Sequence, residues 1–128
     1  MEVVPYNGTT LAYIGDAVMS LKVREMLVLQ GYQKPKILQQ KSVAWVSAKA
    51  QAHFLIKLQE QHFFHEDEEY IILRGRNAKS DSIAKNASVS VYRMSTGLEA
   101  LWGYLYLTNK IERLEELWTA MKEIGEYV

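Results

Sequence analysis

The chain has 128 residues, 48% of them hydrophobic, which is typical of one compact domain and argues against intrinsic disorder. It contains no cysteine, which excludes disulfide bonds and thiolate-bound metal centres, and its hydrophobic runs are too short to span a membrane. Fifteen basic and fifteen acidic residues give a formal net charge of zero. We therefore expect a single domain over residues 1–128, located in the cytoplasm.

Long periodic hydrophobic runs, with only two prolines and seven glycines, predict an all-α fold, a helical bundle without strands. The first helix is expected to begin at Thr9 or Thr10, because either residue can act as an N-cap, and to end at Gly31. The buried stripe of this helix is expected to consist of Leu11, Ile14, Val18 and Leu21.

Three shorter helices are expected to follow. Pro35 suits the first turn of a helix over about residues 35–44, and Ser47 can cap a helix that ends near residue 61. An acidic run predicts a further helix over about residues 65–75, since acids in a first turn complement the helix dipole.

The polar segment 75–86 predicts a mobile loop. Ser88 then caps a long helix, and a final helix starts near Lys110. The hydrophobic stripe of the long helix consists of Val91, Met94, Leu98, Leu101 and Leu105. That of the final helix consists of Ile111, Leu114, Trp118 and Met121.

The zero net charge conceals a strong segregation of charge along the chain. Residues 31–58 carry five lysines and no acid, and residues 71–93 carry five basic residues against Asp81 alone. These segments together sum to +9, so the remainder of the chain sums to −9. Such segregation indicates a directed electric field that favours a nucleic acid as partner, although solvated helix faces can produce part of it.

Two carboxylates occupy unusual positions in predicted helices. Asp16 lies in a hydrophobic run beside Gly15, and Glu99 lies between Gly97 and Gly103. The small residues around each acid leave space for a ligand to approach, and two such carboxylates fit a hard oxygen-ligand site for Mg²⁺. The alternative is that both acids are ordinary residues on solvated helix faces.

A basic, polar run covers residues 74–80, with the sequence RGRNAKS. Arginine side chains bind phosphates through two parallel hydrogen bonds, and a glycine allows close approach of a ligand to the backbone. The alternative is an ordinary basic surface loop. If the partner is RNA, the candidate contacts are Arg74, Arg76, Asn77, Lys79 and Lys85.

Residues 11–18 (LAYIGDAV) resemble the signature helix of the ribonuclease III family, and residues 98–107 (LEALWGYLYL) resemble its second acidic helix. Together with residues 74–80 and 92–96, the order of these motifs is similar to the single-domain Mini-ribonuclease III branch. The resemblance implies a Mg²⁺-dependent endoribonuclease that acts as a homodimer on double-stranded RNA. In this branch the implied substrate is precursor large-subunit (23S) ribosomal RNA, and no separate double-stranded-RNA-binding domain is expected.

The resemblance assigns catalysis and metal binding to Asp16 and Glu99. Larger family members bring four carboxylates to each site, whereas Ala12 and Thr96 stand at two of the expected positions here. The absence of carboxylates at these two positions leaves a second hypothesis open, namely that the protein is a catalytically inactive RNA-binding ribosome-assembly factor. A third is a helical protein-interaction module whose charged segments pair with a partner.

Overall fold

The computed structural model describes residues 6–78 and 88–128, and over these residues the chain is all helical, as predicted. It forms six helices: α1 (Gly8–Leu29), α2 (Pro35–Val46), α3 (Ala48–Glu60), α4 (Glu66–Arg76), α5 (Val89–Leu107) and α6 (Ile111–Ile124).

The ends of the helices follow local capping chemistry. Ser47 and Ser88 accept hydrogen bonds from the backbone N–H groups three residues onward, each at 3.1 Å, and so cap α3 and α5 as predicted. The predicted cap of the first helix is wrong, because Asn7 accepts the hydrogen bond from the N–H of Thr10 at 2.8 Å and α1 therefore begins at Gly8. The side-chain oxygen of Asn7, and not the hydroxyl group of Thr9 or Thr10, therefore caps α1.

The fourth helix is slightly longer than predicted. Four acids occupy its first turn, as expected, and His65 and Glu68 form a reciprocal capping box. At its other end α4 continues through Gly75 to Arg76. Gly75 has no side chain, so its backbone packs closely against α5 instead of ending the helix. Only Asn77 and Ala78 of the remaining predicted loop are described, and residues 79–86 lie outside the described part of the chain.

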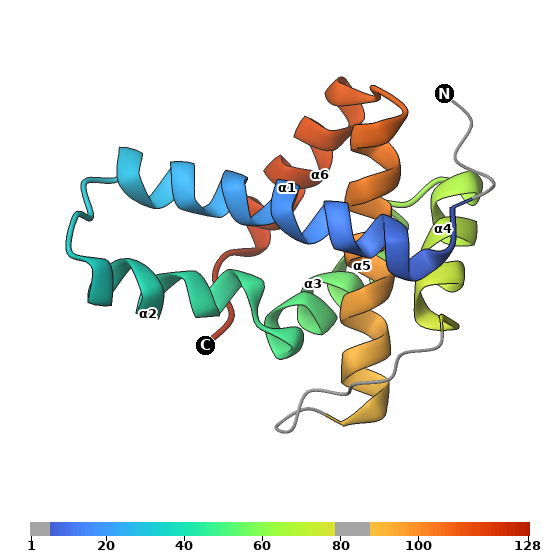
Figure 1. Ribbon diagram of the computed structural model, residues 1–128, viewed down its shortest axis with the longest axis horizontal. Helices are drawn as coiled ribbons and strands as arrows, with labels where there is room; N and C mark the ends of the chain where they lie inside the picture. The colour runs from blue at the N-terminus through green and yellow to red at the C-terminus, as the bar shows by residue number, and fades with distance from the viewer. Residues whose placement is uncertain (1–5, 79–87) are drawn as a thin grey trace.

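Helix α5 lies at the centre of the molecule and contacts α1, α3, α4 and α6 (Figure 1). Helix α1 crosses it, α2 lies alongside α1 after a short connection, and α4 packs on the opposite side from α2 (Figure 1). None of the helices in residues 6–78 and 88–128 is long and hydrophobic enough to cross a bilayer.

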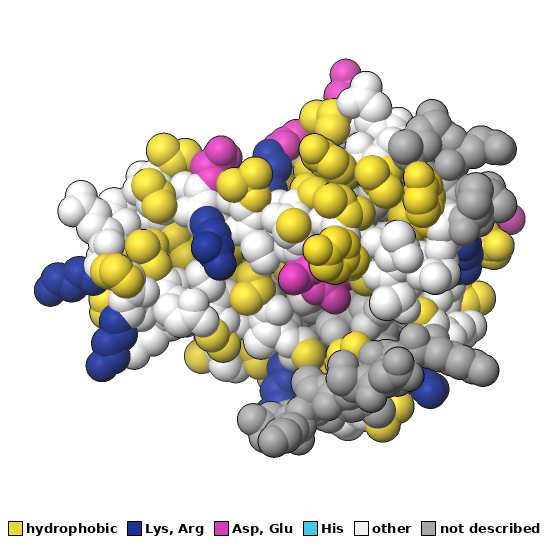
Figure 2. Space-filling view, in the orientation of Figure 1, with side chains coloured by type: hydrophobic (Ala, Val, Ile, Leu, Met, Phe, Trp, Pro, Cys, Tyr) yellow, Lys and Arg dark blue, Asp and Glu magenta, His cyan; other side chains and the backbone are white. Residues whose placement is uncertain are grey.

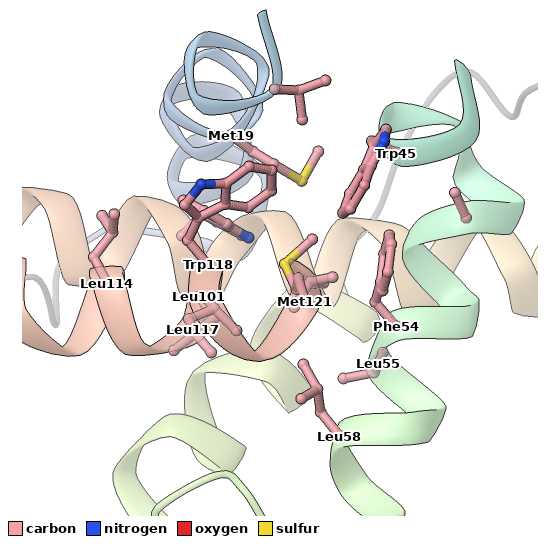
Figure 3. Close-up of a cluster of buried hydrophobic side chains, with 14 of the residues drawn as sticks. Met19, Trp45, Phe54, Leu55, Leu58, Leu101, Leu114, Leu117, Trp118 and Met121 are labelled. Carbon is pink, nitrogen blue, oxygen red and sulfur yellow. The ribbon is translucent and has the colours of Figure 1, made fainter. Parts of the chain in front are cut away.

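The main core lies where α1, α3, α5 and α6 meet (Figure 3). Trp45 packs against Phe54 and Trp118, with ring centroids 5.5 and 5.4 Å apart, and Trp102 is fully buried. The hydrophobic residues predicted to be buried in α5 and α6 lie in or against this core, apart from Val91 and Ile111. Burial of each large side chain stabilises the fold by about 1.5–3 kcal/mol, so this core fixes the position of α5.

The predicted stripe of α1 is partly wrong. Leu11 is buried, but Leu21 is 66% exposed, and the core contacts are made by Met19, Val23 and Leu27. Helix α1 is hydrophobic on more than one side, so helical periodicity selected a stripe that is rotated from the buried one. The consequence is that hydrophobic side chains of α1 remain on the surface.

Candidate active site

Helices α1 and α5 cross at two glycines. A Cβ atom on Gly15 would lie 1.8 Å from the backbone oxygen of Glu99, and a Cβ atom on Gly103 would lie 2.0 Å from that of Leu11. Both distances are shorter than any non-bonded contact, so only glycine permits the two backbones to approach this closely. Gly103 thus marks a close approach, as predicted, but the group that approaches is the backbone of α1 and not a ligand.

The crossing brings the two predicted carboxylates together. Asp16 follows Gly15 directly, and its side chain lies close enough to the carboxyl group of Glu99 to raise the pKa of that group. Asp16 is exposed, whereas Glu99 is half-buried. Acidic side chains gather on the surface beside α1, close to the point where it crosses α5 (Figure 2). The pair is therefore anchored at Glu99 and open to solvent at Asp16.

The environment of Glu99 disfavours a second negative charge. Burial, followed by the hydrogen bond and the negative charge of Asp16, raises the pKa of Glu99 to about 8, against an ordinary value of 4.5. A hydrogen bond from Gln51 acts in the opposite direction. Near neutral pH the carboxyl group of Glu99 thus retains a proton in the metal-free chain, which a cation can replace.

Gln51 is a residue of this site that the sequence interpretation missed. It lies in α3, is only 2% exposed, and its Nε2 donates to the backbone oxygen of Val46 at 3.0 Å and to Oε2 of Glu99 at 3.3 Å. The signal in the sequence is the position of this glutamine on a buried helix face. Leu55 and Leu58, four and seven residues after Gln51, lie on the same face. A polar residue on a buried helix face needs partners, and one of its partners here is the candidate catalytic acid.

The donor set of the pair suits a small hard cation. Both groups supply carboxylate oxygens, and Mg²⁺ commonly binds through one or two carboxylates while keeping several of its waters. The Gln51 amide that contacts Glu99 carries a further oxygen, Oε1, which is buried and has no hydrogen-bond partner among the described residues. No group of three or more His, Cys, Asp or Glu side chains suited to a metal occurs in the described ranges. Asp16 and Glu99 thus fit a sparse, water-rich site, because Ala12 and Thr96 add no carboxylate.

The predicted RNA contacts Arg74, Arg76 and Asn77 lie together at the C-terminal end of α4, beside the start of α1. A Cβ atom on Gly8 would lie 2.5 Å from the backbone oxygen of Arg74, whose guanidinium donates to the backbone oxygen of Tyr6. Eight residues separate Gly8 from Asp16, about 12 Å along the helix axis. Lys79 and Lys85 lie outside the described residues.

A hollow of about 510 Å³ lies beside the contact between the first turn of α1 and the last turns of α4. Its lining includes Arg74, Asn77 and the N-terminal residues of α1, the end of that helix at which the helix dipole is positive. The junction of α1 and α4 thus combines a basic helix end with a hollow.

The other lysine-rich segment, residues 31–58, forms α2 and α3. Lys34, Lys36, Lys49 and Lys57 are exposed, and within the described part of the chain no lysine of this segment makes an ion pair. The described ion pairs instead lie within or between α4 and α6 and the residues that cap them, together with one between Lys22 and Glu115. These lysines of α2 and α3 are therefore available to a negatively charged partner.

Comparison with known proteins identifies the class to which this fold and site belong. The sequence profile of the Ribonuclease III domain matches residues 9–110, which include both carboxylates and the basic end of α4. The crystal structure of a protein from Fusobacterium nucleatum is similar, with a TM-score of 0.82, 29% sequence identity, and 91% of this chain and 93% of that chain covered.

Named relatives narrow the class. A Mini-ribonuclease 3 from Enterococcus faecalis is 48% identical over 94% of this chain and 92% of its own length, and one from Streptococcus pneumoniae is 49% identical over 93% and 94%. One from Staphylococcus aureus is 50% identical over 87% of this chain and 83% of its own length. The chain therefore belongs to the ribonuclease III family, in the group of Mini-ribonuclease 3 proteins, and is an endoribonuclease.

Proposed function

We propose that this chain is a Mg²⁺-dependent endoribonuclease that cleaves double-stranded RNA, with Asp16 and Glu99 as its catalytic residues and metal ligands. The observation that carries the proposal is the contact between these two carboxyl groups at the glycine crossing of α1 and α5. The family uses divalent metal ions, and the hard carboxylate oxygens of the pair favour Mg²⁺ over softer metals.

The two carboxylates have different roles in the proposed site. Glu99, half-buried and bonded to Gln51, provides a fixed ligand, while Asp16 faces the solvent from which the substrate arrives. Bound here, Mg²⁺ supplies an activated water and stabilises negative charge on the scissile phosphate and the leaving oxygen. The open side of the pair gives an RNA backbone access to both carboxylates.

We assign RNA binding to Arg74, Arg76, Asn77, Lys79 and Lys85. Duplex RNA is recognised mainly through its phosphates and 2′-hydroxyl groups, which basic and amide side chains bind. The position of Arg74 and Asn77, which line the hollow at the start of α1, supports this assignment, and Arg76 lies in the same last turn of α4. The exposed lysines of α2 and α3 are secondary candidates.

We further propose that the chain acts as a homodimer in which each subunit cleaves one strand of the duplex. Tyr13, Leu21, Val28 and Leu29 project from α1 with more than half of each side chain exposed, and Figure 2 shows hydrophobic side chains gathered over this helix. Exposed hydrophobic patches of this kind commonly mark protein interfaces. A two-fold axis through α1 suits a duplex, whose strands are themselves related by two-fold symmetry.

The proposed substrate is precursor 23S ribosomal RNA, and the proposed location is the cytoplasm. This substrate is the one that the resemblance to Mini-ribonuclease 3 implies, and the chain spans more than nine-tenths of the length of two such proteins. We propose that residues 1–128 form one endonuclease domain that provides RNA contacts of its own.

A cleavage assay on a perfect RNA duplex tests this function. Purified protein with Mg²⁺ should cut the duplex but not the separated strands, and Asp16→Asn and Glu99→Gln should each reduce single-turnover cleavage by more than about 100-fold, because loss of even an indirect metal partner costs 10–100-fold. Both variants should still bind duplex RNA. Binding without cleavage by the unmodified protein would favour the inactive assembly factor, and no salt-dependent RNA affinity would favour a protein-interaction module.

A further inference from the structure

We infer that Gln51 is a positioning residue of the metal site, which holds the carboxylate of Glu99 in place through Nε2 and offers Oε1 to the hydration shell of the bound cation. The inference rests on the proposed function of the Asp16–Glu99 pair. It concerns a residue of α3 that belongs to neither acidic motif.

The hydrogen bonds of Gln51 fix the orientation of its amide. Nε2 has two hydrogens, and both are used, one on the backbone oxygen of Val46 at 3.0 Å and one on Oε2 of Glu99 at 3.3 Å. The reversed amide would place an oxygen against two acceptors, which is unfavourable. Gln51 thus connects the end of α2 to the candidate catalytic acid on α5.

Burial makes this link stiff. Gln51 is 2% exposed, and its neighbours Ala50, Ala52 and Phe54 are buried in the same helix. A side chain enclosed on all sides has few alternative rotamers, so it holds its partner with little freedom. Asp16, in contrast, is exposed, and Gly15 adds no side chain that supports it. We therefore assign the orientation of the metal ligands chiefly to Glu99 and Gln51.

The second polar atom of the Gln51 amide, Oε1, provides a further observation that points to the cation. Oε1 of Gln51 is buried and lacks a partner within the described part of the chain. A buried acceptor without a donor is unfavourable by about 1–3 kcal/mol, and native proteins rarely leave one. Mg²⁺ retains several of its waters when carboxylates bind it, and a metal-bound water is a strong donor. The orphaned oxygen next to Glu99 is thus explained by a hydrated cation.

The test measures metal binding directly, with Mn²⁺ as the probe because it also prefers octahedral oxygen ligands and its free concentration is visible by electron paramagnetic resonance. Gln51→Met keeps the length of the side chain and removes both polar atoms. We expect at least about 10-fold weaker Mn²⁺ binding and a matching rise in the Mg²⁺ concentration that gives half-maximal duplex cleavage. The affinity for duplex RNA, measured in the presence of a metal chelator, should be unchanged.

Ser47→Ala is the matched control. This substitution weakens the same junction of α2 and α3, because it removes the hydrogen bond by which Ser47 caps α3 at the N–H of Ala50. Ser47 makes no described contact with Glu99. It should lower the melting temperature and leave Mn²⁺ affinity unchanged. If Gln51→Met does not fold, Gln51→Asn withdraws the amide by one methylene and should weaken Mn²⁺ binding in the same direction.

The outcomes separate this inference from the proposed function. Equal Mn²⁺ affinity in the folded Gln51 variants and in the unmodified protein would overturn the role of Gln51 alone. If the unmodified protein bound no Mn²⁺ and cut no duplex, the proposed function itself would fail.

Discussion

Gly15 of α1 and Glu99 of α5 are in direct backbone contact, so close that a Cβ atom on the glycine would lie 1.8 Å from the glutamate carbonyl oxygen. Because Asp16 follows Gly15, this contact sets the separation of the two carboxyl groups. The packing of the fold and the assembly of the candidate site therefore depend on the same pair of residues.

Gly15→Ala should separate α1 from α5 and disrupt the site. Inserting atoms into a close-packed contact is usually destabilising by about 1–3 kcal/mol, and the backbone position of the clash here leaves no flexible side chain to yield. Urea denaturation should show a loss of at least that size, together with reduced duplex cleavage. Thr119→Ala, at an exposed position of α6, should change stability by less than about 0.5 kcal/mol. An equally small effect for Gly15→Ala would refute the crossing.

The stability of the metal-free protein should depend on the ionisation of Glu99. Its pKa is raised from 4.5 to about 8 in the folded chain, so between these values the folded chain retains a proton that the unfolded chain has lost. The stability from this group is fully present below its unfolded pKa and is lost as the pH rises through its folded pKa.

Glu99→Gln should abolish that contribution. In urea unfolding with chelator, the stability of the variant relative to the unmodified protein should increase from pH 4.5 to 8, and Mg²⁺ at pH 8 should stabilise only the unmodified protein. Parallel pH curves for the two proteins would show that Glu99 titrates normally.

The arginines at the end of α4 should contribute to the salt dependence of RNA binding. Arg74 and Arg76 also have structural contacts, since Arg74 donates to Tyr6 and the stem of Arg76 lies against Gly97. Glutamine is therefore a better replacement than alanine, because it keeps most of the stem and removes the charge. The double variant should flatten the slope of log K against log salt by about one for each lost phosphate contact.

Lys122→Gln provides the control for this experiment, because Lys122 is an exposed cation on α6 that contacts the ring of Trp118. For this variant, the slope of log K for RNA binding against log salt should equal that of the unmodified protein. If the double arginine variant also kept the original slope, the RNA would bind elsewhere, with the lysines of α2 and α3 as the next candidates.

The exposed hydrophobic face of α1 should be the dimer contact. Leu21 is 66% exposed in the single chain, so an arginine there can point into solvent without disturbing the core, but it would place a charge in an apolar interface. Sedimentation should give about twice the chain mass of 14.8 kDa for the unmodified protein and a single chain mass for Leu21→Arg. Ile56→Arg, at a 45% exposed position of α3, should sediment as the unmodified protein does; loss of the dimer in both variants, or in neither, would contradict this assignment.

Much of the fold was predictable because the helix ends carry local signals. Pro35, Ser47 and Ser88 each define a helix start through backbone chemistry that acts within a few residues, and these predictions are confirmed. The buried face of α1 was not predictable in the same way. Residues such as Met19 and Leu21 are both hydrophobic, and only the position of α5 decides which of them is buried.

The candidate site was predictable in part for the same reason. Asp16 and Glu99 are conspicuous because a charged side chain in a hydrophobic run needs an explanation within the sequence itself. Their contact depends on Gly15 and Gly103 facing each other across two helices that are distant in sequence. Gln51 belongs to no motif, and its role follows only from the packing of α3 against α5.

The central claim, that Asp16 and Glu99 together bind a divalent cation, is tested most directly by mapping the position of the ion. Fe²⁺ substituted for Mg²⁺ generates hydroxyl radicals with ascorbate, and these cut the polypeptide next to the bound metal. We expect cuts in α1 near Asp16 and in α5 near Glu99, which excess Mg²⁺ suppresses and which Asp16→Asn abolishes. Cuts at other positions, or cuts at these positions that persist in Asp16→Asn, would contradict the account.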